Sequence, residues 1–484
     1  MFRGSAPYNN KRPRQRSAAI AGGRVRIGDA LGGTMMRIAR RVHICMGPLR
    51  ASAGLLVTFG HKSNRQRLIK GGCANNKERR IVMEHNKDRI ILHCDCNGFY
   101  ASVSLLPYPE LKDKPVVVGG NQQTRHGIVL AKNEAAKKYG IKTAQTIQSA
   151  LRLCPDLIIL PPQRERYEYF SKIINEIYNS YTDLVEPFGI DESWLDVTNS
   201  YHLFAKDGKE LADMIRQRVY YETGLTISVG VSFNKIFAKL GSDYKKPNAT
   251  TVITPENYKQ LLYPLDVADM MYVGKTTREN LYGMGIRTIG QLACADVNLL
   301  EDKFGKHGRE LHIYANGLED SPVAPFDSER EIKSIGSGNT FRRNIKGLED
   351  IKPALMVLSD QVGTRLRKHG MYANGVQITI RTPAFVNFTR QCRITSTNVS
   401  DTIYKTALKL LLDNWNVNAE IRMLTVTAID LTHEKRAEQT SLFDSGKTET
   451  DVKKENLQKA LDKLNKKYGR DTVQNASVMK SDLF

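Results

Sequence analysis

From Asp88 onward the chain alternates apolar strand-like runs with helical patterns, but without the regular strand–helix–strand repeat of a doubly wound fold. The strand-like runs cover residues 89–95, 114–119, 127–130, 184–198 and 225–231, and the helical patterns cover residues 133–139, 165–181, 208–223 and 234–242. This order predicts an α+β fold in which helices cover one face of a sheet. The 484 residues allow about three domains with separate cores.

Positive charge is concentrated at the N-terminus. Residues 1–82 hold 18 Lys and Arg against two acids, whereas the whole chain has a formal net charge of +21. This segment lacks sustained periodicity, so residues 1–86 are expected to form a basic, disordered extension. A nucleic-acid arm, an Arg-rich transit peptide and upstream sequence translated from a misassigned start are the alternatives. The third is favoured because Met83 lies just before the first strand.

Composition excludes two classes of protein. No stretch reaches the roughly 20 apolar residues of a membrane-spanning helix. The seven cysteines are scattered without a CxxC pair, which argues against a disulfide scaffold or a zinc ribbon. A reducing, cytoplasmic setting is therefore expected.

Three carboxylates stand at strand ends. Asp95 ends the run 89–95, and Asp191 and Glu192 are adjacent within an otherwise apolar segment, EPFGIDESWLDV. Solvated acids on a surface hairpin are one interpretation. The alternative is an oxygen-only site that suits Mg²⁺, which requires a turn or bulge at the adjacent acids because strand alternation would send them to opposite faces.

Basic side chains recur in the same half of the chain, where several can face one polyanion, although each alone fits a solvated surface residue. They are Arg125, Lys132, Lys137, Lys235, Lys239 and Lys246. No GxxxxGK[ST] loop is present, so P-loop nucleotide chemistry is unsupported. Further along, residues 273–292 predict a helix–hairpin–helix with Gly283 and Gly285 in the hairpin. Either backbone amides there approach a DNA phosphate, or the segment is a plain helix–helix turn.

The last domain predicts strands at 333–341, 376–382, 391–395 and 422–431, with helices at 348–369 and 401–415. Arginines recur on it, among them Arg342 and Arg343. They indicate either a sheet laid along a phosphate backbone or scattered arginines on a solvated face. The tail holds an isolated apolar peptide, QTSLF, and a helix over 452–468 with one apolar face that either folds back or stays free.

Taken in order, these motifs resemble the Y-family translesion DNA polymerases, in the bacterial DNA polymerase IV branch. The motifs are DCNGFYASV, EPFGIDESWLDV, VSFNKIFAKLGSDYKKPN, the helix–hairpin–helix and QTSLF. The resemblance covers about residues 88–443 and implies a right-hand polymerase. Its implied parts are a palm at 87–105 and 155–262, fingers at 106–154, a helix–hairpin–helix thumb at 263–325, an α/β little finger at 332–432 and a tail at 433–484.

The resemblance also implies roles for single residues. Asp95, Asp191 and Glu192, with the Cys96 backbone carbonyl, would hold two Mg²⁺ ions, for which Mn²⁺ can substitute. Tyr100 falls at the steric-gate position that selects deoxynucleotides. The implied dNTP contacts are Phe99, Tyr100, Lys137 and Lys246; the implied DNA contacts are Gly283, Gly285, Arg342 and Arg343; the implied sliding-clamp anchors are Gln439, Leu442 and Phe443.

Several positions depart from the family pattern. Asn97 stands where many members have aspartate, Ser104 replaces a frequent glutamate, and Glu134 occupies a position that is often tyrosine. Lys137 appears where arginine is usual, which puts the details of triphosphate binding in doubt. The implied protein is a monomeric, distributive, error-prone polymerase without proofreading. The alternative from another class is a DNA-binding accessory factor whose acids are vestigial.

Overall fold

A computed structural model describes residues 88–120, 127–328, 331–436, 447–469, 472–473, 478 and 483. The chain divides into two units, Met1–Gly72 and Cys73–Phe484, and all described residues belong to the second. The basic extension and the expected clamp anchors Gln439, Leu442 and Phe443 lie outside the described residues. No helix in the described ranges is both long and apolar enough to cross a membrane.

The carboxylates lie on a five-stranded sheet in the order β5-β6-β1-β7-β8. Its strands are β1 (Ile91–Cys96), β5 (Val185–Pro187), β6 (Glu192–Asp196), β7 (Ile227–Ser232) and β8 (Thr250–Val252). Every residue of β1 and β7 is buried, including the polar His93 and Asp95 on β1 and Ser228 and Ser232 on β7. All neighbouring strands pair antiparallel except β7 and β8, which are parallel.

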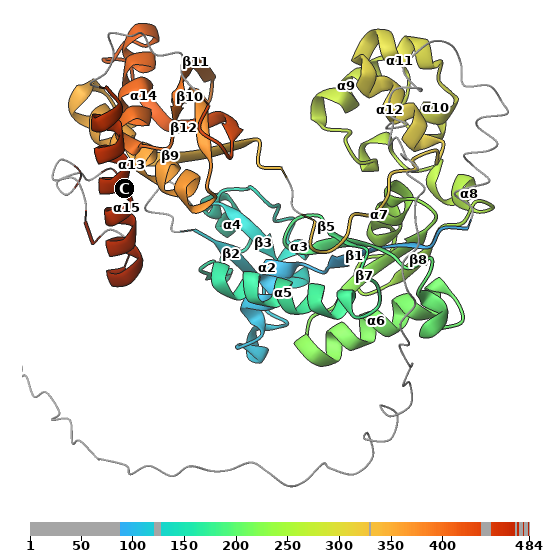
Figure 1. Ribbon diagram of the computed structural model, residues 1–484. Coiled ribbons are helices and arrows are strands. Elements are labelled where there is room, and N and C mark those ends of the chain that lie inside the picture. The colour runs from blue at the N-terminus through green and yellow to red at the C-terminus, as the bar shows by residue number, and fades with distance from the viewer. Residues whose placement is uncertain are drawn as a thin grey trace, which may run out of the picture. The chain divides into compact units, whose positions relative to one another are not determined.

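Helices cover both faces of this sheet, so the expectation of one covered face is wrong. On one face of the sheet, three helices pack against an apolar core that includes Cys94 of β1. They are α2 (Phe99–Leu105), α5 (Arg164–Asn179) and α6 (Gly208–Thr223). On the other face α7 (Lys235–Tyr244) packs against β1 and β7, as Figure 1 shows. A Cβ on Gly230 would lie 1.9 Å from the Ala238 carbonyl oxygen. Only glycine therefore allows α7 to lie this close to β7.

Two smaller bodies accompany the five-stranded sheet, a three-stranded sheet with its helices and a helical segment. A three-stranded sheet in the order β3-β2-β4 packs against two helices around a small apolar core. Its elements are β2 (Val116–Gly119), β3 (Val129–Lys132), β4 (Ile158–Leu160), α3 (Glu134–Lys138) and α4 (Ile147–Leu153). The helical segment comprises α8 (Tyr258–Leu262), α9 (Lys275–Gly283), α10 (Ile289–Cys294), α11 (Val297–Phe304) and α12 (Lys306–Ala315). Short 3-10 helices lie at η2 (Pro109–Leu111), η4 (Tyr201–Leu203) and η5 (Val267–Asp269).

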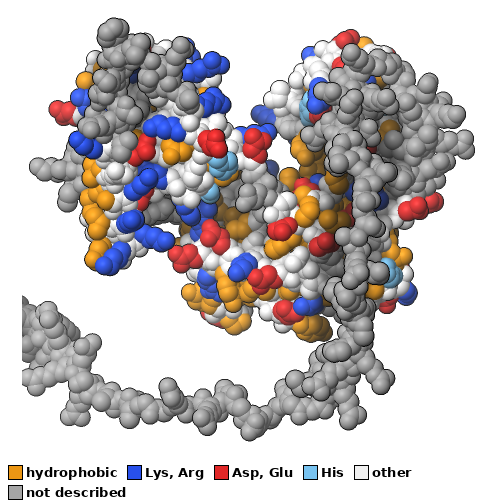
Figure 2. Space-filling model, in the orientation of Figure 1, with side chains coloured by type: hydrophobic (Ala, Val, Ile, Leu, Met, Phe, Trp, Pro, Cys, Tyr) orange, Lys and Arg blue, Asp and Glu red, His pale blue; other side chains and the backbone are white. Residues whose placement is uncertain are grey.

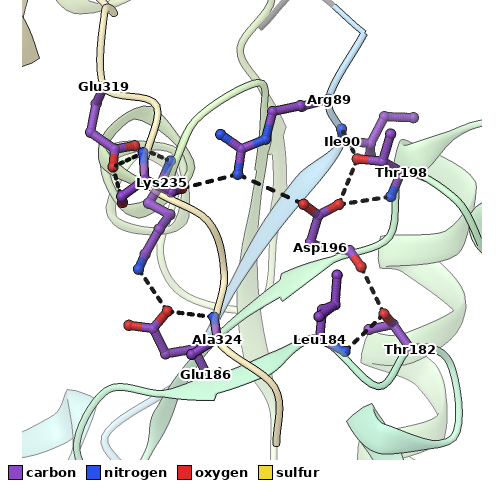
Figure 3. A network of polar contacts seen from close by, with 11 residues as sticks. Arg89, Ile90, Thr182, Leu184, Glu186, Asp196, Thr198, Lys235, Glu319 and Ala324 are labelled. Carbon is purple, nitrogen blue, oxygen red and sulfur yellow. Dashed lines mark hydrogen bonds and ion pairs between the residues drawn. The ribbon is translucent and has the colours of Figure 1, made fainter. Parts of the chain in front are cut away.

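Residues 317–326, which we call the strap, leave the helical segment and bind along the five-stranded sheet (Figure 3). The Glu186 carboxylate accepts hydrogen bonds from the Lys235 ammonium at 2.7 Å and from the Ala324 amide at 2.9 Å. Val323 is buried against Ile91 and Trp194. The strap is therefore fixed by polar contacts around one apolar anchor.

A four-stranded antiparallel sheet in the order β11-β10-β12-β9 forms the last body. Two long helices bury their apolar faces against it. The elements are β9 (Ser334–Ile345), β10 (Tyr372–Arg381), β11 (Asn387–Thr397), β12 (Ile421–Thr432), α13 (Gly347–Lys368) and α14 (Ser400–Asn414). The predicted strands and helices of this region are confirmed. A final helix, α15 (Lys447–Tyr468), contacts this body through polar side chains.

Candidate active site

Two of the predicted carboxylates face each other across neighbouring strands. In the antiparallel register of β1 and β6, Asp95 lies opposite Glu192, so both side chains point to the same face of the sheet. Asp191 precedes the first residue of β6, and its carbonyl accepts a hydrogen bond from the Cys96 amide at 3.0 Å. Residues 189–191 form a bend before β6, so Asp191 lies outside the regular strand.

Asn97 fixes a lysine loop beside these acids. Its Nδ2 donates to the Ser228 hydroxyl on β7, and its Oδ1 accepts from the Asn248 amide, both at 2.8 Å. These bonds tie the segment that carries Lys246 to the end of β1. Asn97 thus supplies a donor as well as an acceptor at a position where an ionised aspartate would only accept.

Two lysines neutralise part of the acidic cluster. The Lys246 ammonium lies 2.7 Å from Asp95 Oδ2 and 2.7 Å from Asp243 Oδ1. The Lys239 ammonium, from α7, lies 3.1 Å from Asp95 Oδ2 and 2.8 Å from Glu192 Oε2. Burial alone would lower the pKa of both lysines, but the surrounding acids raise it above the ordinary value, so both stay charged.

The three acids respond differently to the same cluster. Burial, together with the charges of Asp95 and Glu192, raises the pKa of Asp191 to about 6. Burial likewise raises the pKa of Asp95, outweighing its two lysines. For Glu192 burial acts in the same direction, but His93 and Lys239 outweigh it and lower the pKa to about 2. The cluster therefore holds excess negative charge at Asp191 and Asp95.

His93 is a site residue that the sequence reasoning missed. His93 Nδ1 lies 2.8 Å from the Ser242 hydroxyl, which donates to the Lys239 carbonyl at 2.8 Å. His93 Nε2 lies 3.4 Å from Glu192 Oε2. Burial lowers the pKa of His93, which favours the neutral form. The available signal was its position two residues before Asp95, on the same face of β1.

The donor set fits a hard divalent cation. Carboxylate oxygens are the ligands that Mg²⁺ prefers, and the raised pKa values of Asp191 and Asp95 indicate negative charge that a cation would compensate. Among the described residues, the donor atoms of His93, Asp95 and Glu192 all lie within 4.8 Å of one another. Asp191 is not in that trio, although the trio's acids raise its pKa.

An aromatic pair follows β1. Phe99 is buried, whereas Tyr100 is half-buried with its ring 4.4 Å from the Tyr167 ring, at an interplanar angle of 32°. The Ser104 hydroxyl lies 2.7 Å from the Tyr167 hydroxyl. Ser104, which replaces a frequent family glutamate, therefore fixes the ring on which Tyr100 rests.

Other residues that were predicted to bind dNTP or DNA have different partners in the structure. Lys137, on α3, lies 3.5 Å from the Glu134 carboxylate, and both side chains are exposed. In the described structure Lys137 therefore pairs with Glu134, which stands where the family often has tyrosine. On β9, Arg342 is exposed, while Arg343 donates two hydrogen bonds to Asp350 at 2.7 and 2.8 Å.

The two hairpin glycines differ in backbone conformation. Gly285 has φ +81°, a left-handed conformation that favours glycine. Gly283 ends α9 with no positive φ, and an added Cβ would meet nothing within 4 Å. The described structure thus leaves the backbone at Gly283 open to a partner.

Comparison with known proteins gives the class. A family model described as the impB/mucB/samB family matches residues 94–243, and the C-terminal domain model of the same family matches residues 332–442. A solved Y-family DNA polymerase chimera is 26% identical with a TM-score of 0.64, and the match covers 71% of this chain and 100% of that chain.

Full-length relatives give the branch. DNA polymerase IV of Acetivibrio thermocellus is 43% identical over 395 residues, which cover 81% of this chain and 98% of the relative. DNA polymerase IV 1 of Bacillus subtilis is 37% identical over 398 residues, which cover 82% and 94%. The chain therefore belongs to the Y family of DNA polymerases, with the DNA polymerase IV proteins as its relatives. It is a DNA-directed DNA polymerase of the translesion class, acting on primer-template DNA and dNTPs with a divalent metal.

Proposed function

We propose that the chain is a low-fidelity polymerase that extends primers across damaged template by two-metal nucleotidyl transfer and lacks proofreading. The observation that carries the proposal is the cross-strand pair of Asp95 and Glu192, with Asp191 beside it in the turn before β6. Three carboxylates with a strongly perturbed pKa in one buried cluster are typical of a catalytic site. No exonuclease-like segment is visible in the sequence.

The three carboxylates and the Cys96 carbonyl would hold two Mg²⁺ ions, or Mn²⁺ in their place. Bound there, the metals would activate the primer 3′-hydroxyl and neutralise the triphosphate and the leaving pyrophosphate. Lys246 lies 2.7 Å from Asp95 and would contact the same triphosphate as a cation. Phe99 and Tyr100 would lie under the sugar, where the Tyr100 ring excludes a ribose 2′-hydroxyl.

Each body of the fold can be assigned to one part of a right-hand polymerase. We assign the five-stranded sheet to the palm (87–105 and 155–262), β2, β3, α3 and α4 to the fingers (106–154), α9 to α12 to the thumb (263–325) and the four-stranded body to the little finger (332–432). Strand β4 (Ile158–Leu160) pairs with β2 although it lies in the palm's residue range. Lys137 belongs to the fingers, so its proposed contact with the triphosphate requires it to leave Glu134, 3.5 Å away.

DNA contacts are proposed at two places. The open backbone at Gly283 and Gly285 would approach a phosphate. Arg342 is exposed on β9 and would bind phosphate directly, whereas Arg343 must first give up its two bonds to Asp350. Arg342 is therefore the stronger of the two candidates.

Primer extension with Mg²⁺ and dNTPs, on an undamaged and an abasic template, tests the site. The full-length protein and Glu165→Gln, which changes an exposed acid on α5, are expected to synthesise past the lesion. Asp191→Ala is expected to lose more than about 10²-fold in rate while its DNA affinity stays unchanged. Without dNTPs the primer should keep its length, since no proofreading is expected.

Equal extension by Asp191→Ala and the unchanged protein would refute the site assignment. If the unchanged protein extends neither template but binds the duplex, it is a DNA-binding accessory factor instead. Shortening of the primer would refute the absence of proofreading.

We also propose that QTSLF binds a sliding clamp, with Gln439, Leu442 and Phe443 as anchors on an otherwise monomeric enzyme. Phe443→Ala should weaken clamp-stimulated synthesis and leave clamp-free synthesis unchanged. An equal loss in both assays would contradict the docking role.

A further inference from the structure

The two carboxylate oxygens of Glu192 have different surroundings. The Lys239 ammonium at 2.8 Å and His93 Nε2 at 3.4 Å both face Oε2. Oε2 is buried, unlike the acidic side chains that Figure 2 shows scattered over the molecular surface, where water can bind their oxygens. Within the described ranges, no hydrogen bond or ion pair reaches Oε1. Protein groups therefore hold one oxygen of Glu192 and leave the other to a ligand.

The His93 ring is fully buried, and its two nitrogens have different neighbours. Nδ1 lies 2.8 Å from the Ser242 hydroxyl on α7, and the ring meets the edge of Trp194 with centroids 5.2 Å apart. Nε2 makes no full hydrogen bond within the described part of the chain, and Glu192 Oε2 is the acceptor that faces it. Buried polar atoms in folded proteins are nearly always hydrogen-bonded. A partner for Nε2 is therefore expected, and Glu192 is the group in place.

Electrostatics decides which ring nitrogen carries the hydrogen. A neutral imidazole has one N–H, and a bare Nε2 lone pair beside the Glu192 carboxylate would be repelled, whereas Nε2–H would be attracted. The Ser242 hydroxyl, which donates to the Lys239 carbonyl at 2.8 Å, lies equally far from Nδ1 and can rotate its hydrogen to it. The Lys239 carbonyl loses little, because inside α7 it also accepts from the amide four residues on.

We propose that His93 is a positioning residue that donates Nε2–H to Glu192 Oε2, accepts from Ser242 at Nδ1, and so keeps Glu192 Oε1 free for a divalent metal. This inference rests on the proposed function, in which Glu192 is a metal ligand. A ligating carboxylate is commonly held by an outer hydrogen-bond partner, and loss of that partner typically weakens metal binding about 10- to 100-fold.

Lys239 alone cannot fix Glu192 in this way. Its ammonium is shared with Asp95 Oδ2 at 3.1 Å and Asp243 Oδ2 at 3.4 Å, and it ends a flexible four-carbon stem. The His93 ring is rigid and is held on two sides, by Trp194 and by Ser242. The imidazole therefore defines the orientation of the carboxylate, and the lysine supplies charge.

Binding of Mn²⁺ alone to the full-length protein, without DNA or nucleotide, tests this role. The free ion is measured by electron paramagnetic resonance, and displacement by Mg²⁺ gives the Mg²⁺ affinity. His93→Leu, which removes the donor, is expected to bind both ions about 10- to 100-fold more weakly. His93→Gln, whose amide can donate to Glu192 and accept from Ser242, should stay within about 3-fold of the unchanged protein.

His93→Asn gives a second test of the donor, which also serves if His93→Leu does not fold. Its shorter amide reaches Ser242 but not Glu192, so it should weaken Mn²⁺ binding as the leucine variant does. Urea unfolding in a chelating buffer shows which variants are folded.

A double-mutant cycle separates positioning from packing. Ser242→Ala should weaken Mn²⁺ binding about 3-fold in the unchanged protein and have no effect in His93→Leu, because the hydroxyl acts through the ring. Ser232→Ala is the matched control, since it removes a buried hydroxyl of β7 that donates to the Ile253 carbonyl at 2.9 Å. This control should bind Mn²⁺ as the unchanged protein does.

Asp191→Ala distinguishes failure of this inference from failure of the proposed function. If Asp191→Ala loses Mn²⁺ affinity but His93→Leu does not, the metal site stands and the role of His93 is wrong. If His93→Gln binds as weakly as His93→Leu, the ring acts by its shape and not as a donor, which also overturns the inference. If Asp191→Ala binds Mn²⁺ as tightly as the unchanged protein, the metal site and the inference fall together.

Discussion

The neutral variant Asp191→Asn should make the metal-free protein more stable. The pKa of Asp191 is about 6 in the folded protein, against 3.8 for an unperturbed aspartate. At about 1.4 kcal/mol per unit, this shift corresponds to roughly 3 kcal/mol, which screening at a half-buried carboxylate reduces to about 1–2 kcal/mol. Because the folded pKa is raised, the stabilisation from the bound proton is present below pH 3.8 and is lost as the pH rises through about 6.

The measurement is urea unfolding in a chelating buffer. The chain has two tryptophans, and Trp194 is buried on β6 beside the carboxylates, so its fluorescence reports the five-stranded body when Trp415→Phe removes the other signal. At pH 7.5 Asp191→Asn should gain about 1–2 kcal/mol in free energy of unfolding, and at pH 5 about half of that. Added Mg²⁺ should stabilise the unchanged protein and not the variant.

The control is Glu165→Gln, an exposed acid on the same body, which should stay within about 0.5 kcal/mol. Asp191→Asn that is no more stable than this control at pH 7.5 would refute the reasoning. A gain that does not shrink at pH 5 would show that the titration of Asp191 is not its cause.

Three further predictions follow from close contacts in the structure. Gly230→Ala should lower the free energy of unfolding by at least about 3 kcal/mol in the same assay, because its Cβ would meet the α7 backbone, whereas Gly274→Ala, in open space, should change little. Glu186→Ala leaves the Lys235 ammonium and a strap amide without their acceptor, so it should cost about 1–3 kcal/mol and speed proteolysis within 317–326; unchanged cleavage would contradict this. Tyr100→Ala should raise ribonucleotide insertion relative to deoxynucleotide at least about 10-fold in single-nucleotide extension, and unchanged discrimination would exclude Tyr100 as the gate.

Local signals in the sequence predicted the elements well. The helix predicted at 208–223 is α6 (Gly208–Thr223), because Asp207 accepts from the Glu210 amide at its start and Gly224 ends it in a left-handed conformation. The proximity of Asp95 and Glu192 was likewise predicted, since both acids stand at strand ends of one sheet.

The sequence did not predict which residues distant in the chain contact each other. Lys235 and Lys239 lie one turn apart on α7, yet Lys239 contacts Glu192 and Lys235 binds Glu186. Periodicity places both on one helix but does not fix which element each side chain meets. The helix α15 shows the same limit, because the pattern located its apolar residues but did not predict the contact of Asp462 with Arg367.

The strap also limits how far the four-stranded body can range. Its last residue bonded to the five-stranded body is Phe326, whose amide donates to the Asp183 carbonyl at 3.0 Å, and Ile332 already packs against the core of the four-stranded body. The chain between these two anchors is residues 327–331, so the anchors can lie at most about 20 Å apart. Releasing the strap would add its length to this connection, so the contacts of Glu186 set how far the last body can move from the five-stranded sheet.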